Sequence, residues 1–323
     1  MRKPDHASPV YLRGQRRLVE PAGYFFDQSR IKLMSKYSIA YLDGAFVSAD
    51  DATILQTHAL HYATAVFEGI RVYDGHAFLL EAHVERLLRS ARLIGLEPAL
   101  SEDGYIAILK ETIARSGLSN AYLRPVIYQG GPDLGVYAPN NKVSFGVLIW
   151  DWPAVFGAEG VSRGIAITTK VPYQRPSPAC FPSEAKSSAG YLIGGINRRE
   201  AAKAGFDDAL MLTYDGFVAE ASGANIFAVY EGKVVTPKPI GILNGITRQT
   251  VIQNLPADFS IDEIDLELST LLKADEVFLT GTAYEIMPVR QIDDATFVPG
   301  PLTARMAEIY RSLTNPVKEL VES

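Results

Sequence analysis

Three Asp-Gly pairs, each between two short apolar segments, limit the folds that this chain can adopt. The pairs stand at residues 43–44, 74–75 and 215–216, within the segments 41–47, 71–78 and 212–218. Because Asp and Gly tolerate positive φ, such a pair is typical of a tight β-hairpin turn, whose two strands are antiparallel. The chain is therefore expected to contain antiparallel sheet rather than a strict alternation of parallel strands and helices.

Other segments have the periodicity of helices or the composition of strands. The segment 81–93 carries apolar residues on one face, and Ser101 and Gly117 are a candidate N-cap and stop for the next helix. The predicted helices cover 81–93, 102–115, 190–203, 247–255 and 302–313, and the predicted strands cover 121–129, 143–150, 164–170, 209–213, 224–230 and 276–280. This mixture predicts an α+β fold.

The length of 323 residues is sufficient for about two domains. The segment 151–162 is rich in Gly, Ala and Pro, and we interpret it as a linker between a small N-terminal domain (34–150) and a larger C-terminal domain (163–323). Residues 1–33 hold seven basic and three acidic side chains. They are expected to be a poorly ordered extension before a natural start near Met34.

Charge and cysteine content argue against several classes of protein. Residues 34–323 have 24 basic and 34 acidic side chains, which is unsuited to binding nucleic acid. A single cysteine, Cys180, allows no intramolecular disulfide and favours a reducing compartment, here predicted to be the cytoplasm. The apolar runs are too short to span a membrane, and the five histidines show no metal-ligand spacing, so no metal site is expected.

Lys186 is a candidate nucleophile because it stands among small residues in the segment 182–191. Small neighbours leave room for a planar cofactor beside the amine, and a buried lysine can form a Schiff base with a carbonyl group. A lysine in such a loop is also commonly a solvated surface residue. The segment alone leaves both interpretations open.

Three further segments are suited to a phosphorylated heteroaromatic cofactor. Residues 243–248 place Gly245 before a predicted helix, whose first N–H groups can bind phosphate, although a plain N-cap turn has the same pattern. Residues 278–283 end a strand with two threonines around a glycine, which suits an anion-binding rim or a turn. Glu220 is suited to holding a protonated ring nitrogen, or to lying in solvent after a hairpin.

Taken in order, these segments resemble the branched-chain aminotransferases, which belong to the class IV aminotransferases of the fold-type IV PLP group. The resemblance covers residues 37–313 and is carried by the segments 58–71 (HALHYATAVFEGIR), 122–125, 133–136, 186–191, 220–225, 243–248 and 281–283. It implies a smaller N-terminal α/β domain and a larger C-terminal pseudo-barrel domain. It also implies ping-pong transamination between leucine, isoleucine or valine and 2-oxoglutarate.

The resemblance further implies a role for each residue of the site. Lys186 would bond to pyridoxal 5′-phosphate (PLP) and move a proton between substrate and cofactor, Glu220 would hold the pyridine nitrogen, and Tyr191 the phenolic oxygen. The other cofactor-binding residues would be Arg86, Leu243, Ile246, Thr247 and Thr282. The substrate-binding residues would be Tyr62, Phe67, Arg71, Tyr122, Arg124, Leu134, Val136 and Ala283.

Substrate selection and assembly follow from the same resemblance. Three tyrosines and Phe67 would form an apolar cage for a branched side chain, while Arg124 would pair with the distal carboxylate of glutamate. Residues 134–136 would come from the partner subunit, so a homodimer or a higher homo-oligomer acting on small molecules is expected. Arg86 points away from the apolar face of its own predicted helix, so periodicity alone places it in solvent.

Three alternatives stay open. A D-amino-acid or (R)-amine transaminase and an aminodeoxychorismate lyase-like enzyme would share the fold and the cofactor, whereas a noncatalytic α+β binding module would need neither Lys186 nor Glu220. The chain also departs from the family at 152–155, which reads WPAV where Trp-Gly-Ala-Tyr is frequent. Val155 would remove a hydroxyl group from the pocket wall and leaves the preferred keto acid open.

Overall fold

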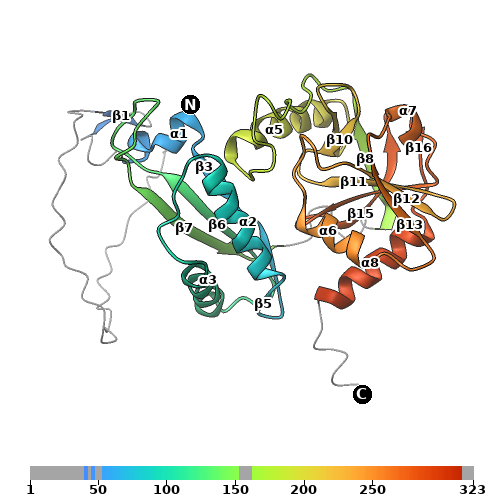
Figure 1. Cartoon of the computed structure of the whole chain (residues 1–323), viewed down its shortest axis with the longest axis horizontal. Helices are drawn as coiled ribbons and strands as arrows, with labels where there is room; N and C mark the ends of the chain where they lie inside the picture. The colour runs from blue at the N-terminus through green and yellow to red at the C-terminus, as the bar shows by residue number, and fades with distance from the viewer. Residues whose placement is uncertain (1–39, 43–44, 48–52, 153–161, 315–323) are drawn as a thin grey trace, which may run out of the picture.

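The computed structural model describes residues 40–42, 45–47, 53–152 and 162–314, whose strands form two large sheets and a separate hairpin (Figure 1). The hairpin pairs β1 (Ala40–Leu42) with β2 (Ala45–Val47). The predicted extension 1–33 and most of the predicted linker 151–162 lie outside the described residues. The domain boundaries therefore stay a prediction.

The first large sheet is built around the long strand β6 (Ala121–Gln129). One edge of β6 pairs antiparallel with β7 (Val143–Trp150), and the other edge pairs in succession with β3 (Ala65–Phe67) and β4 (Ile70–Tyr73), which β5 (His76–Ala77) extends. Helices α2 (Leu80–Leu93) and α3 (Glu102–Ser116) pack against this sheet. The apolar face predicted for 81–93 is buried in the resulting core.

The second large sheet has nine strands and curls into a half-barrel (Figure 1). Its order is β10-β9-β8-β15-β14-β11-β12-β13, with β16 paired to β15. Its strands are β8 (Ile165–Thr168), β9 (Asp208–Leu212), β10 (Val218–Ala221), β11 (Asn225–Tyr230), β12 (Lys233–Pro237), β13 (Ser260–Ile264), β14 (Glu276–Gly281), β15 (Glu285–Ile292) and β16 (Ala295–Thr296). The neighbours β8–β9, β8–β15 and β12–β13 are parallel, and the other pairs are antiparallel.

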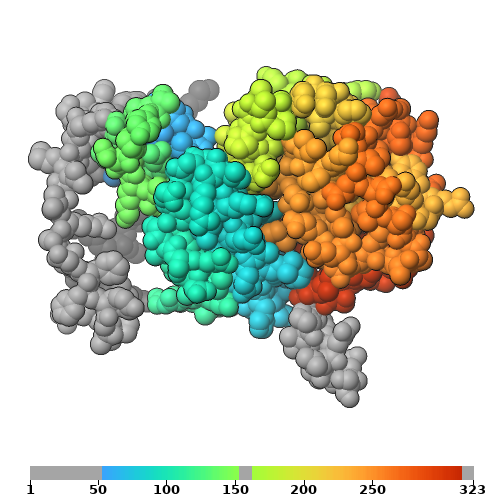
Figure 2. Space-filling view, in the orientation of Figure 1, coloured from blue at the N-terminus to red at the C-terminus, as the bar shows by residue number. Residues whose placement is uncertain are grey.

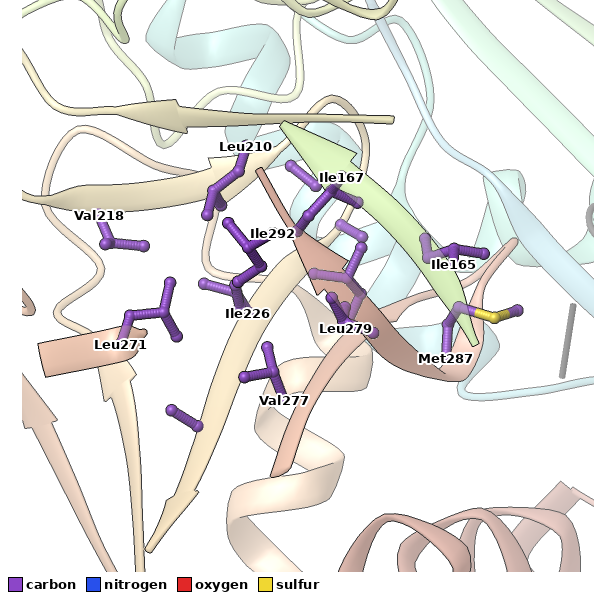
Figure 3. Close-up of a cluster of buried hydrophobic side chains, with 14 of the residues drawn as sticks. Ile165, Ile167, Leu210, Val218, Ile226, Leu271, Val277, Leu279, Met287 and Ile292 are labelled. Atoms are coloured by element: carbon purple, nitrogen blue, oxygen red, sulfur yellow. The ribbon is translucent and has the colours of Figure 1, made fainter. Parts of the chain in front are cut away.

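Both faces of this second sheet are buried, which explains why its central strands are continuous apolar runs. Successive side chains of a strand point to opposite faces. Along β14, Val277 and Leu279 point into the core shown in Figure 3. Phe278 instead stacks on Phe227, at 5.0 Å between ring centroids, in the layer covered by α6 (Ile246–Gln253) and α8 (Pro301–Thr314).

Most of the predicted elements are confirmed. Strands β6 and β7 have the predicted ends, Ser101 caps α3 by accepting from the N–H of Gly104, and Gly117 ends that helix at φ 68°. In the second hairpin, Asp74 and Gly75 both have positive φ, as predicted. The third hairpin differs, because five residues separate β9 from β10 and the Thr213 hydroxyl closes a wider turn by accepting from the N–H of Phe217.

The parts that carry the two large sheets contact each other directly (Figure 2). Phe78 packs edge-on against Tyr310 of α8, and the Tyr73 hydroxyl donates to Glu285 at 2.6 Å. A site formed between the two parts can therefore use residues of both. Among the helices that the structure describes, none combines the length and the apolar character needed to cross a membrane.

Candidate active site

A cavity lies where residues of α2 meet the second sheet and its loops. The other segments that line it are the one leading into α5 (Ser188–Lys203), the turn after β10, the start of α6 and the end of β14. All eight residues predicted to hold the cofactor lie in this lining: Arg86, Lys186, Tyr191, Glu220, Leu243, Ile246, Thr247 and Thr282.

Lys186 is held in the cavity wall by β3 of the first sheet and by α2, which packs against that sheet. Its N–H donates to the Ser90 hydroxyl of α2 at 3.0 Å, and its carbonyl accepts from the N–H of Phe67 at 3.1 Å. The amine Nζ donates to the Tyr191 hydroxyl at 2.5 Å, within the first turn of α5. Of the two interpretations that the sequence left open, the structure favours a lysine that faces a site over a solvated one.

Glu220 is a buried carboxylate on β10, not a solvated residue after a hairpin. One of its oxygens accepts from the N–H of Leu243 at 3.3 Å and from the Asn225 amide at 3.4 Å. The other oxygen lies 3.2 Å from Nε of Arg175. Burial raises the pKa of Glu220, and the nearby positive charge of Arg175 opposes this rise.

Arg86 is buried, so the placement in solvent that periodicity predicted for it is wrong. Glu68 supplies the counter-charge: its carboxylate accepts from Nε of Arg86 at 2.6 Å, from one Nη at 2.8 Å, and pairs with Nδ1 of His83 at 2.8 Å. Burial acts to raise the pKa of Glu68, but Arg86 and His83 outweigh it and hold the pKa far below its ordinary value. The other Nη of Arg86 is buried without a hydrogen-bond partner among the described residues.

The start of α6 provides further donors for an anion. Asn225 shapes the preceding loop by donating to the carbonyl of Leu243 at 2.8 Å and accepting from the N–H of Gly245 at 3.2 Å. A side chain at Gly245 would clash, because its Cβ would lie 2.3 Å from the Asn225 oxygen. The N–H groups of Ile246 and Thr247 have no acceptor within the helix and are suited to a phosphate group.

These groups fit PLP. The unpartnered Nη of Arg86 and the start of α6 suit its phosphate, Glu220 suits its ring nitrogen, and Lys186 suits its aldehyde carbon. The residues that the structure describes include no group of three or more His, Cys, Asp or Glu side chains placed to hold a metal ion.

A second cavity adjoins the first and shares Lys186 and Tyr191 with it. Four predicted substrate-binding residues line this cavity: Phe67, Tyr122, Arg124 and Ala283. The Phe67 ring packs against Tyr191 at 4.8 Å between centroids, and the Arg124 guanidinium lies 4.8 Å above the Phe67 ring. The wall therefore combines aromatic surface with positive charge, since Arg198 and Lys186 line the same cavity as Arg124.

The other four predicted substrate-binding residues line neither cavity. Tyr62 lies with the segment 134–136, since its hydroxyl donates to the carbonyl of Leu134 at 2.8 Å, and both Tyr62 and Val136 are exposed. Arg71 instead lies 3.9 Å from Glu285 and above the ring of Tyr73. It therefore contributes to the contact between the parts that carry the two large sheets. Val155 lies outside the described residues.

Several residues of the two cavities had no role in the sequence-based prediction. Arg175 and Asn225 line the first cavity, and Arg198 of α5 lines the second. Asn225 ended one of the motif segments, so a signal was present, whereas no local pattern distinguishes Arg175 or Arg198. Glu68 was also within a motif segment, but its partners Arg86 and His83 are on α2, and only the folded chain brings them beside the end of β3.

Comparisons with known proteins show the family of the chain. The family model for amino-transferase class IV matches residues 65–292. The branched-chain-amino-acid aminotransferase of Pseudomonas aeruginosa is 34% identical over 88% of this chain and 95% of that protein. The putative branched-chain-amino-acid aminotransferase of Methanocaldococcus jannaschii is 36% identical over 84% and 95%.

Solved structures show the same relationship. The Escherichia coli branched-chain amino acid aminotransferase has a TM-score of 0.78 and 33% identity, with 84% of this chain and 92% of that chain covered. The PLP form of the Thermobaculum terrenum branched-chain amino acid aminotransferase has a TM-score of 0.74 and 29% identity, with 84% and 92% covered. The chain thus belongs to the class IV aminotransferase family and has the fold-type IV architecture.

Proposed function

We propose that this chain is a PLP-dependent branched-chain-amino-acid aminotransferase, which exchanges the amino group between leucine, isoleucine or valine and 2-oxoglutarate. The names of relatives that are 33–36% identical over most of the chain support this activity. The observation that carries the proposal is the shared cavity in which Lys186, Glu220 and the unpartnered Nη of Arg86 meet.

The chemistry divides between the cofactor and the chain. Bound PLP supplies the electron sink that makes the Cα–H bond of an amino acid acidic. Glu220 holds the ring nitrogen, while Arg86 and the start of α6 hold the phosphate. Nζ of Lys186 accepts the proton from the substrate Cα and later returns a proton, and the Tyr191 hydroxyl 2.5 Å away orients this amine.

The second cavity explains how one site can accept two kinds of substrate. Burying a branched side chain against Phe67 and Tyr122 stabilises its complex by about 1.5–3 kcal/mol. The distal carboxylate of glutamate cannot use that apolar surface, so Arg124 provides a charge-assisted partner in the same cavity. Because the two substrates occupy the site in turn, the kinetics are ping-pong.

The proposal extends to a homodimer in which Tyr62 and residues 134–136 enter the partner's site. The segment is held in shape by the Tyr62–Leu134 hydrogen bond and by a 2.9 Å contact between Nε2 of His58 and the carbonyl of Gly135. Val136 is nevertheless 81% exposed in the isolated chain, which suits a residue that a second copy covers.

Two further points belong to the proposal. The buried clusters on either side of the predicted linker support a division into domains near residues 151–162. The exposed thiol of Cys180 supports a reducing compartment such as the cytoplasm.

A panel of amino donors tests the proposed activity. The absorbance of the PLP-loaded protein should change with L-leucine, L-isoleucine, L-valine and L-glutamate, and not with D-alanine. Initial rates at several fixed concentrations of 2-oxoglutarate should give parallel reciprocal lines. A response to D-alanine alone, intersecting lines, or release of pyruvate without a keto-acid acceptor would contradict the proposal.

A further inference from the structure

Arg175 and Glu220 form a buried ion pair in the wall of the cofactor cavity. Nε of Arg175 lies 3.2 Å from Oε1 of Glu220, and the two side chains are 7% and 10% exposed. Both residues line the cavity that holds Lys186. The two come from different elements, since Glu220 is on β10 and Arg175 belongs to the segment between β8 and α5.

Several segments of the chain hold the guanidinium of Arg175 in place. Its Nη1 donates to the carbonyl of Gly190 at 3.0 Å, and its Nε also reaches the carbonyl of Gly241 at 3.3 Å. Its main-chain N–H donates to the carbonyl of Leu212 at 2.8 Å. The guanidinium is therefore a fixed charge beside Glu220, not a mobile surface group.

Glu220 needs such a charge because burial favours its neutral form. The O–H of a neutral carboxylic acid donates a hydrogen bond, whereas holding a protonated ring nitrogen requires a carboxylate that accepts a hydrogen bond from the ring N–H. Besides Arg175, the charged group that acts on Glu220 is the amine of Lys186. That amine is the group expected to bond to the cofactor, so of these two cations the guanidinium is the one that keeps its charge throughout.

We propose that Arg175 is a positioning residue that keeps Glu220 an ionised hydrogen-bond acceptor for the ring nitrogen of the cofactor. This inference rests on the proposed function. With Arg175 present, the proton stays on the ring nitrogen and the ring stays electron-withdrawing. Without it, the proton affinity of Glu220 rises about ten- to a thousandfold, so the carboxyl group competes with the ring nitrogen for the proton.

A purely structural role makes a different prediction. If Arg175 only joined the carbonyls of Gly190 and Gly241, its substitution would loosen the loops without moving the proton of the ring nitrogen. Arg175→Lys keeps the charge but loses the planar donor group, and Arg175→Met removes the charge but keeps an apolar stem. Comparing the two variants separates the effect of the charge from the effect of the loop contacts.

The test measures the ring nitrogen itself. Full-length protein is loaded with PLP that carries ¹⁵N in the ring, and the ¹⁵N chemical shift is followed from pH 6 to 9. Wild type, Arg175→Lys and the exposed control Arg305→Met should show a protonated ring, whereas Arg175→Met should shift toward the unprotonated position. Glu220→Gln provides the reference for a ring without its carboxylate.

Two results must be distinguished. If Arg175→Met shows the wild-type ¹⁵N shift across this pH range, the inference about Arg175 is wrong, while the proposed function stands. If wild-type protein does not bind PLP, the proposed function fails and the inference falls with it. Should Arg175→Met lose the native circular dichroism spectrum, Arg175→Gln, which also lacks the charge, is used in the same measurement with the same two outcomes.

Discussion

Glu68 accepts two hydrogen bonds from Arg86, at 2.6 and 2.8 Å, inside the protein core. The carboxylate is fully buried and Arg86 nearly so, and the pair connects the end of β3 to α2. The pair fixes the guanidinium of Arg86, which lines the cofactor cavity and whose remaining Nη has no hydrogen-bond partner among the described residues. An ion pair inside the core thus determines the direction of a group at the site.

Replacing Glu68 with Gln should destabilise the fold strongly. Removing one partner of a buried ion pair leaves the other charge uncompensated, which costs about 3–5 kcal/mol. The free energy of unfolding, measured by denaturant titration at pH 7, should fall by this amount. The matched control is Glu81→Gln on α2, the helix that carries Arg86; the exposed carboxylate of Glu81 lies 3.8 Å from Lys110 and should contribute less than about 1 kcal/mol.

The stabilisation by Glu68 should depend on pH in a defined direction. The folded protein holds the pKa of Glu68 far below its value of about 4.3 in the unfolded chain. The contribution is therefore complete above the unfolded pKa and is lost as the pH falls through and below it. The difference in the free energy of unfolding between wild type and Glu68→Gln should be constant from about pH 6 to 7 and smaller at about pH 3.5. A larger difference at about pH 3.5 would contradict a lowered pKa of Glu68 in the folded protein.

Gly69→Ala should impair substrate binding by displacing Tyr122. A Cβ at position 69 would lie 1.8 Å from the Tyr122 hydroxyl, so that ring must leave its place in the substrate cavity. We expect kcat/KM for leucine to fall about tenfold or more, as when a well-packed aromatic side chain is forced out of place. Gly146→Ala on β7 is the control, because its Cβ would meet no atom within 4 Å. Equal losses of kcat/KM in both variants would contradict this prediction.

Arg124→Met should affect the two half-reactions unequally. Loss of a hydrogen bond to a charged group costs about 1.5–3 kcal/mol, so the glutamate half-reaction should slow about ten- to a hundredfold. The leucine half-reaction uses the apolar wall and should change little. Single-turnover absorbance changes measure both rates, and Arg124→Lys should recover part of the glutamate rate; equal losses for both donors would remove Arg124 from this role.

Mixed dimers test whether the segment 134–136 serves the partner's site. Val136→Asp and Lys186→Ala should each be nearly inactive as pure proteins. A hybrid of the two has one site with an intact lysine and an intact partner segment, so an equal mixture refolded together should regain about a quarter of wild-type activity. Recovery should be absent if each chain uses its own segment, and that result would reject the exchange.

Local signals were sufficient for many elements of the fold. The Ser101 cap, the Gly117 stop and the ends of β6 and β7 all come from patterns within a few residues. Strand β15 was not predicted, because Pro288 argues against a strand. In the structure Pro288 pairs with Phe278 of β14. Strand β3 was missed because three residues are too few to show a period.

The candidate site could likewise be predicted only in part, because local patterns do not show contacts between distant residues. Motif order was sufficient to name the eight residues of the cofactor cavity, but not the contacts that orient them. Glu68 and Arg86 are 18 residues apart, and Arg175 and Glu220 are 45 apart, so no local pattern relates either pair. Helical periodicity places Arg86 in solvent because it considers only the residue's own helix, whereas the counter-charge of Arg86 comes from the end of a strand.

Covalent trapping shows whether Lys186 bonds to the cofactor. The PLP-loaded protein is reduced with borohydride, digested, and analysed by mass spectrometry, with Lys186→Ala as the control. A reduced pyridoxyl adduct should be found on the peptide that contains Lys186, and it should be absent from the variant. An adduct on a different lysine, or no adduct in wild-type protein whose bound PLP is confirmed by absorbance, would show that Lys186 is not the Schiff-base lysine.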